Sequence, residues 1–169
     1  MLRPLPAISV FLLVLLAILP WGGPAWFEPA LALLSLGAIY FWSLRRPRLM
    51  PALVVFGLGL LLDVLTHGPL GVWAAAALIA GLAGRLARQS RVHPGRLRNF
   101  MFLVLTLFLA ATLVAIVTSL ARWQWPPWRS VGEAVAAAAC AYPVLAALLS
   151  VVDGFWPVVD GRPLFARGD

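Results

Sequence analysis

The sequence is poor in charge and in cysteine, and each shortage excludes a class of protein. Charged residues make up 11% of the 169 residues, whereas soluble domains carry about 25%. Lysine is absent, so all 13 basic residues are arginine. The single cysteine, Cys140, supports neither an internal disulfide framework nor a cysteine metal cluster. A soluble domain and redox chemistry based on cysteine are therefore excluded.

Motifs that usually signal catalysis are also missing. The chain has no P-loop, HExxH, GxSxG, CxxC or glycine-rich dinucleotide fingerprint. Ser9 and Ser35 lie inside apolar segments, without an evident histidine or aspartate at a reachable depth. The arginines fall between apolar segments and form no basic patch on a polar surface. We therefore expect a protein that is not an enzyme, holds no cofactor or metal, and does not bind nucleic acid.

The chain is instead rich in long apolar runs. Hydrophobic residues make up 63% of the sequence, and the mean hydropathy is +0.96. This predicts an all-α polytopic membrane protein with one domain and six transmembrane helices. The expected spans are residues 5–21, 29–44, 50–67, 70–87, 100–120 and 131–152, with a polar loop from Gln89 to Asn99 and a short cytoplasmic tail at 153–169.

The first apolar run allows two interpretations. Arg3, a short apolar core and the following Pro24-Ala25 also fit a cleavable signal peptide. We expect a retained helix because the rest of the chain is polytopic, but the alternative stays open.

The arginines predict the orientation. With a cytoplasmic N-terminus, only Arg122 and Arg129 lie outside. All the others then lie inside: Arg3, Arg45, Arg46, Arg48, Arg85, Arg88, Arg91, Arg96, Arg98, Arg162 and Arg167. Positive charge concentrates on the cytoplasmic side of membrane proteins. Both termini are therefore predicted in the cytoplasm, and the protein is predicted to be a multi-pass membrane protein.

The corner between the third and fourth spans carries the main candidate site. Asp63 lies four residues before His67, and Gly68-Pro69 is expected to end the helix because glycine accepts a left-handed cap and proline cannot continue it. A carboxylate inside an apolar helix needs a partner. Asp63 could pair with His67 or Arg122 and fix the corner, or it could help to dock a partner or ligand. A proton relay or metal site is a third interpretation, but the sequence offers too few ligands for one.

Small residues mark both helices of this corner. Gly57 and Gly59 on the third span, and Ala77 and Gly81 on the fourth, allow close approach of another helix. They either pack the bundle internally or form a face for another protein. Together with Asp63, His67, Gly68, Pro69 and Gly71, they are the candidate partner-binding residues.

Two further features have a simple and a more specific interpretation. Tryptophans at the fifth connection are expected to form an interfacial belt, although they could contact a partner: Trp123, Trp125 and Trp128. The basic loop from Arg85 to Arg98 is expected to set the topology, although it could bind anionic lipid or a cytoplasmic partner.

Several short segments together resemble the MreD family of bacterial rod shape-determining membrane proteins. The resemblance is best over residues 27–84. It is carried by Phe27-Glu28-Pro29, Tyr40-Phe41-Trp42, the basic turn from Arg45 to Arg48, the Gly59-to-Asp63 segment and Gly68-Pro69-Leu70-Gly71. Where many family members have an arginine before the proline of the second span, this chain has Glu28.

The resemblance implies a non-catalytic scaffold of cell-wall elongation and peptidoglycan synthesis, located in the bacterial inner (cytoplasmic) membrane. Such proteins associate directly with MreC, and through it with MreB, RodA and the elongation transpeptidase. The family fold is also thought to be similar to the substrate-binding subunits of energy-coupling vitamin transporters, which provides the alternative function. A solute-binding subunit should line an outward cavity with several polar groups. Apart from Asp63, Thr66, His67 and the tryptophans, the sequence predicts few such groups at the outer end.

Overall fold

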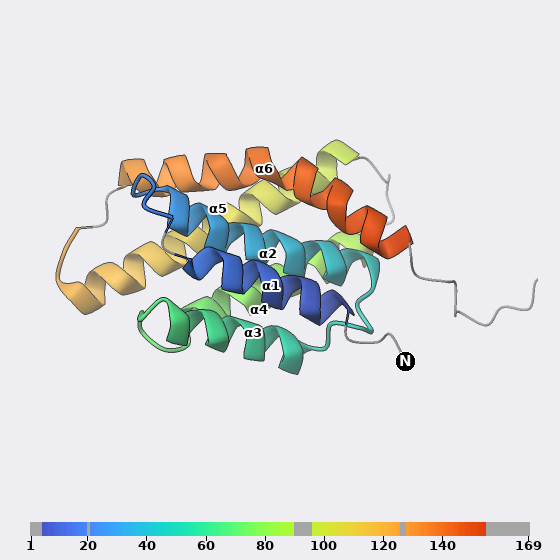
Figure 1. Cartoon of the computed structure of the whole chain (residues 1–169), viewed down its shortest axis with the longest axis horizontal. Helices are drawn as coiled ribbons and strands as arrows, with labels where there is room; N and C mark the ends of the chain where they lie inside the picture. The colour runs from blue at the N-terminus through green and yellow to red at the C-terminus, as the bar shows by residue number, and fades with distance from the viewer. Residues whose placement is uncertain (1–4, 20, 90–95, 126–127, 155–169) are drawn as a thin grey trace, which may run out of the picture.

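The computed structural model describes residues 5–19, 21–89, 96–125 and 128–154. All regular secondary structure in this part of the chain is α-helical, which confirms the predicted all-α class (Figure 1). The helices are α1 (Leu5–Ile18), α2 (Phe27–Arg45), α3 (Ala52–Leu65), α4 (Val72–Gln89), α5 (Arg96–Arg122) and α6 (Trp128–Gly154).

Three of these helices are long and apolar enough to cross a membrane. They are α2, α5 over Leu97–Arg122, and α6. In α5 and α6, only 28% of the most apolar window is buried inside the chain. The apolar helices α1 and α3 are shorter, at 14 residues each. The structure is therefore that of a helical protein with membrane-spanning capacity in at least these three helices.

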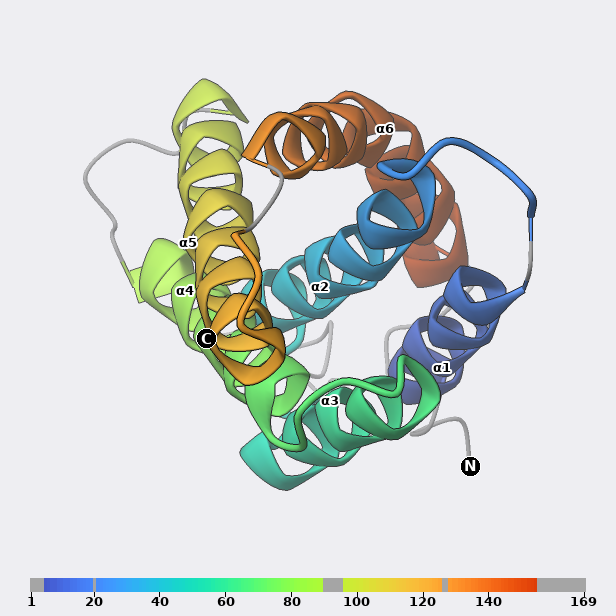
Figure 2. The ribbon, with the colours of Figure 1, turned by 90° about the vertical axis from the view of Figure 1, so that its left-hand side faces the viewer.

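Helix α2 is the centre of the bundle. It packs against α1, α4, α5 and α6, and α3 packs on α4. Viewed along the bundle, the other helices surround α2 (Figure 2). Twelve residues of α2 are buried, and Tyr40 and Trp42 are among the largest fully buried side chains. The Trp42 indole Nε1 donates a hydrogen bond to Ser9 Oγ at 2.9 Å, which ties α2 to α1.

Successive helices run in alternating directions. Residues near the ends of α1, α3 and α5 and near the beginnings of α2, α4 and α6 line one common cavity. We call this end of the bundle the cavity end. The opposite end, where α2 ends at Arg45 and α4 carries Arg85 and Arg88, is the arginine end.

The observed helix boundaries differ from the expected spans in informative ways. The bounds expected for the polar loop, Gln89 to Asn99, are wrong at both ends, because α4 includes Gln89 and α5 begins at Arg96. Arginine and asparagine do not prevent a helix from extending beyond its apolar part. The tail expected at 153–169 begins two residues too early, because α6 continues to Gly154. Residues 155–169 lie outside the described part of the chain.

Two glycines let helices approach within backbone contact. A Cβ added to Gly59 of α3 would lie 2.5 Å from the Cα of Ala74 on α4. A Cβ on Gly84 of α4 would lie 2.6 Å from the carbonyl oxygen of Tyr40 on α2. Neither distance is possible for a side chain, so these glycines determine how closely α4 can lie against its two neighbours.

Candidate functional site

The Asp63 carboxylate joins α3 to the first turn of α4. Asp63 is fully buried. Its Oδ1 accepts a hydrogen bond from the N–H of Trp73 at 2.8 Å, and its Oδ2 accepts from the N–H groups of Gly71 at 2.9 Å and Ala74 at 3.2 Å. The first N–H groups of a helix lack partners within the helix and carry partial positive charge, so an anion is stabilised there.

This arrangement gives Asp63 other partners than those named in the simple interpretation. The carboxylate binds the backbone N–H groups of Gly71 and of the first turn of α4, whereas the simple interpretation had paired it with His67 or Arg122. The simple interpretation, in which Asp63 fixes the corner, is the one that this geometry favours. Its side chain is not on the surface, so any effect on a partner would act through the shape of the corner.

His67 ends α3 in a different manner from the one expected. Its φ is +51°, whereas Gly68 does not have a positive φ. The left-handed position after the helix is thus taken by His67, and the expectation for Gly68 was wrong. A left-handed conformation costs an L-residue roughly 1–2 kcal/mol. Gly71, at φ +97°, takes the second left-handed position, immediately before α4.

Most of the small-residue positions point into the protein. Gly59, Ala77 and Gly81 are buried, and a Cβ on Gly81 would contact Val55. Gly57 is different, because a Cβ there would meet nothing within 4 Å. The interpretation as internal packing therefore fits three positions, and Gly57 alone is open to a partner.

The outward side of α3 forms an exposed apolar stripe around Gly57. Leu53 is 81% exposed, Phe56 39% and Val64 59%. With Gly57 they lie on one side of the helix, because their spacing follows the helical repeat. We call these four residues the α3 stripe.

A cavity of about 540 Å³ opens at the cavity end. All six helices or their flanking residues contribute to it. Its apolar walls include Ala17, Ile18, Ala32, Leu33, Ala111, Val114, Ala115, Val131 and Ala134, and its polar lining consists of Glu28, Thr66, His67, Thr118, Ser119 and Arg122. Ligand pockets typically span about 300–1,000 Å³, so the volume suits a small molecule.

Two opposite charges line this cavity without pairing to each other. Glu28 lies in the first turn of α2 and Arg122 ends α5, and both are exposed. The ion pairs of the described residues join Arg129 to Glu133 and Arg45 and Arg46 to Asp153, and include neither Glu28 nor Arg122. The expectation of few polar groups at this end was therefore wrong. Sequence reasoning missed Glu28, Thr118, Ser119 and Arg122 as cavity residues, although alternating helix directions imply that these helix ends meet.

The expected tryptophan belt borders a second hollow beside this cavity. Trp123 is 96% exposed, Trp125 92% and Trp128 52%. With Ile116 and Leu120 they line a space of about 360 Å³, and Ser119 borders both cavities. Exposed indoles at the end of apolar helices suit a membrane interface.

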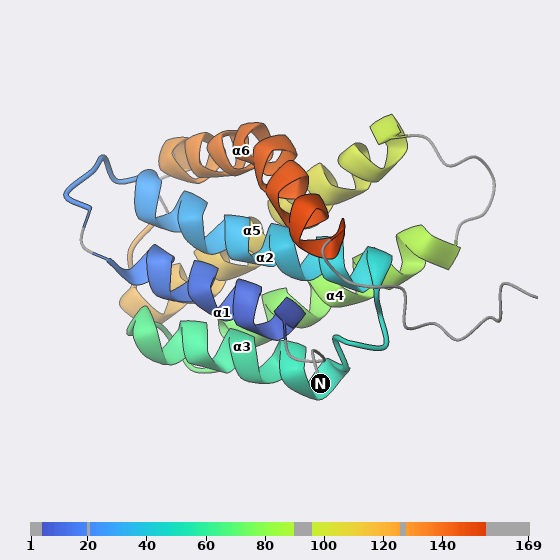
Figure 3. The ribbon, with the colours of Figure 1, turned by 45° about the vertical axis from the view of Figure 1, so that its right-hand side comes forward.

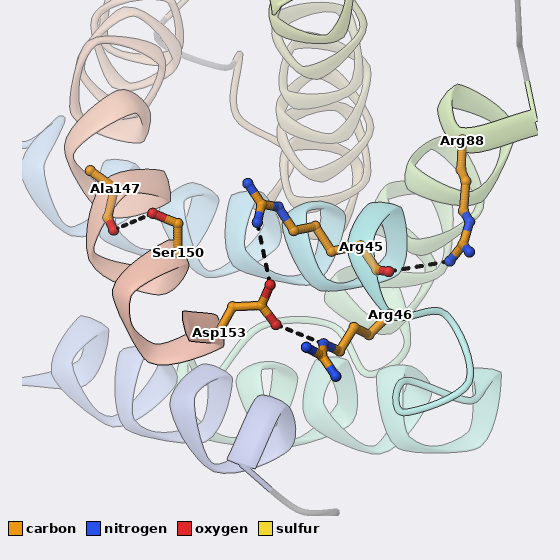
Figure 4. Close-up of polar contacts among 6 residues, drawn as sticks. All are labelled: Arg45, Arg46, Arg88, Ala147, Ser150 and Asp153. Carbon is orange, nitrogen blue, oxygen red and sulfur yellow. Dashed lines mark hydrogen bonds and ion pairs between the residues drawn. The ribbon is translucent and has the colours of Figure 1, made fainter. Parts of the chain in front are cut away.

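The arginine end is closed by hydrogen bonds and ion pairs. Arg46 Nε lies 2.6 Å from Asp153 Oδ1, and Arg45 Nη1 lies 3.3 Å from Asp153 Oδ2, so α2 is tied to the end of α6 (Figures 3 and 4). Arg88 Nη1 donates to the carbonyl oxygen of Arg45 at 3.2 Å, and Arg85 Nη2 donates to that of Met50 at 2.8 Å. Several basic residues thus hold helix ends together in addition to any effect on topology.

No protein-family model, curated protein or solved structure matches this chain.

Proposed function

We propose that this protein is a membrane scaffold of bacterial cell-wall elongation, similar to MreD, that binds MreC. The geometry of the α3–α4 corner is the observation that supports this proposal most. Two of the segments that carry the resemblance, Gly59 to Asp63 and Gly68 to Gly71, come together there, because Gly59 packs against Ala74 and Asp63 accepts a hydrogen bond from Gly71. The corner therefore serves as a structural unit, which suits a scaffold.

The docking surface for MreC is the α3 stripe. MreC proteins cross the membrane once, and a single helix needs an apolar face that lets it approach closely. Gly57 offers such a face between exposed Leu53, Phe56 and Val64. Through MreC, the chain would belong to the assembly that contains MreB, RodA and the elongation transpeptidase.

Affinity purification of the tagged protein from bacterial membranes tests this function. Mass spectrometry should recover MreC with the wild type and lose it with Gly57→Leu, because the added side chain would block close approach of another helix, whereas a Cβ at this position meets nothing within the chain. Gly132→Leu on α6 is the matched control, since a Cβ there also meets nothing within 4 Å. Equal recovery with both variants would overturn the docking surface, and no MreC with the wild type would overturn the scaffold function.

The membrane arrangement of this proposal is six spans with both termini in the cytoplasm. Helices of 14 residues, such as α1 and α3, are only about 21 Å long, whereas the hydrocarbon core of a bilayer is about 30 Å thick. Flanking residues and local thinning of the bilayer make up the difference. On a Cys140→Ala background, an impermeant thiol reagent should label Leu70→Cys in intact spheroplasts and label Arg48→Cys only after lysis. The opposite pattern would reverse the orientation.

The 540 Å³ cavity favours a second candidate function, a solute-binding subunit of an energy-coupling vitamin-type transporter. The same purification distinguishes this candidate. Recovery of paired ATPases with a coupling membrane subunit, in place of MreC, would support transport.

A further inference from the structure

We propose that the cavity binds a zwitterionic amphiphile that carries an ammonium group and a phosphate or carboxylate. Glu28 would face the ammonium group and Arg122 the anionic group. This inference goes beyond the scaffold function and does not depend on MreC.

The charges at the mouth of the cavity define the head of the ligand. A cavity lined by one carboxylate and one guanidinium is complementary to a molecule that carries both a positive and a negative charge. A simple anion would pair only with the guanidinium, and a simple cation only with the carboxylate. Arg122 can present two N–H groups to a phosphate or carboxylate, and a carboxylate such as Glu28 accepts hydrogen bonds from an ammonium group. Both side chains are exposed and reach the cavity without pairing to any other described residue.

The walls define the rest of the ligand. Ala32 of α2 and Ala111 and Ala115 of α5 leave an apolar space behind the charged groups. Ser119, which carries a hydroxyl group, lines both this cavity and the neighbouring space of about 360 Å³ beside the tryptophans. A ligand with an apolar part gains free energy by leaving water for such a space. A membrane lipid could also place a chain against Trp123 and Trp125, whereas a free zwitterion would occupy the cavity alone.

Thermal melting of the full chain in a neutral detergent tests the proposal. The probes are dioleoyl phosphatidylethanolamine, which has a zwitterionic head, glycerophosphoethanolamine, which is that head without chains, and dioleoyl phosphatidylglycerol, which is anionic. We expect one or both ethanolamine probes to raise the melting temperature more than phosphatidylglycerol does. A response to both ethanolamine probes shows that the head carries recognition, and a response to the lipid alone identifies a membrane lipid as the ligand.

Matched variants separate the cavity from surface charge. Glu28→Gln and Arg122→Gln should each weaken the response to the ethanolamine probe about tenfold to a hundredfold in apparent Kd, as expected for loss of a hydrogen bond to a charged group. Glu133→Gln and Arg129→Gln remove an exposed ion pair near the start of α6 that does not line the cavity, and they should retain the response.

A cavity-filling variant provides an independent measurement. Ala115→Phe should abolish the response while the unliganded protein still elutes as a single folded species. Equal responses in all the variants, a preference for phosphatidylglycerol, or no response of the wild type to either ethanolamine probe would overturn the proposal.

Discussion

Replacing Asp63 should destabilise the α3–α4 corner more than replacing any exposed acid. Asp63→Leu removes the acceptor of three backbone hydrogen bonds of 2.8 to 3.2 Å, from the N–H groups of Gly71, Trp73 and Ala74. A hydrogen bond to a charged group contributes about 1.5–3 kcal/mol, and a buried donor left without a partner costs about 1–3 kcal/mol. Because one carboxylate serves all three donors, these costs overlap. We expect Asp63→Leu to lower the free energy of unfolding by about 3–6 kcal/mol.

Asp63→Asn should have an intermediate effect. An amide with its oxygen at the position of Oδ2 keeps the bonds from Gly71 and Ala74, but it turns its NH2 group toward the N–H of Trp73. It also loses the attraction between a negative charge and the start of a helix. We expect a cost of about 1–3 kcal/mol.

The assay is a thermal melt of purified protein in detergent, followed by tryptophan fluorescence. At about 2–4 °C per kcal/mol for a chain of this size, Asp63→Leu should lower the midpoint by roughly 6 °C or more. Glu133→Leu is the control, because its ion pair with Arg129 is exposed and should contribute less than about 1 kcal/mol. If Asp63→Leu and Glu133→Leu melt alike, the carboxylate does not hold α4 and our reasoning on the corner is refuted.

Two other predictions use the same melt. Gly59→Ala should lower the free energy of unfolding by about 1–3 kcal/mol, because its Cβ would lie 2.5 Å from the Cα of Ala74. Gly57→Ala is the control and should be neutral or slightly stabilising, since its Cβ would meet nothing within 4 Å. Equal effects of the two variants would show that α3 and α4 do not approach closely at Gly59. Asp153→Asn should weaken the ion pair with Arg46 and lower the melting midpoint by a few degrees at low salt. The difference from the wild type should be smaller at high salt, because salt screens partly exposed ion pairs. A difference that does not depend on salt would contradict this account.

The fold class was predictable because it depends on composition and on long apolar runs. The positions of all six helices were also predicted to within a few residues, since each apolar run forms one helix. The ends of the helices were less predictable, because a helix continues through polar residues as long as its backbone hydrogen bonds can form. Arg96 and Asn99 were therefore assigned to a loop although they belong to α5.

The partners of Asp63 could not be read from side-chain spacing. The rule for residues four apart points to His67, which lies on the same chain segment. The actual donors are backbone N–H groups eight to eleven residues later, and every non-proline residue carries such a donor. The sequence does contain one signal in retrospect, an acid within an apolar run shortly before the start of the next helix.

The cavity was unpredictable for a different reason. Its space arises because small residues on separate helices, such as Ala32, Ala111 and Ala115, come to the same place. A sequence shows that each residue is small, but it does not show that they coincide. The charged residues Glu28 and Arg122 were visible as helix ends, and only the packing of α2 against α5 makes them part of one site.

The positions of the two proposed sites make their functions separable. Gly57 lies on the outward side of α3 and does not line the cavity, whereas α3 reaches the cavity only at Leu65. Eight residues of helix separate these positions by about 12 Å. Sites this far apart, without shared partners, have nearly additive effects. Gly57→Leu should therefore abolish recovery of MreC and leave the response to glycerophosphoethanolamine or its lipid unchanged. Glu28→Gln should weaken the response to the ethanolamine probe and leave the recovery of MreC unchanged. If either variant impairs both measurements, the ligand and the partner are coupled through α3, and the cavity would then be part of the mechanism by which the scaffold binds.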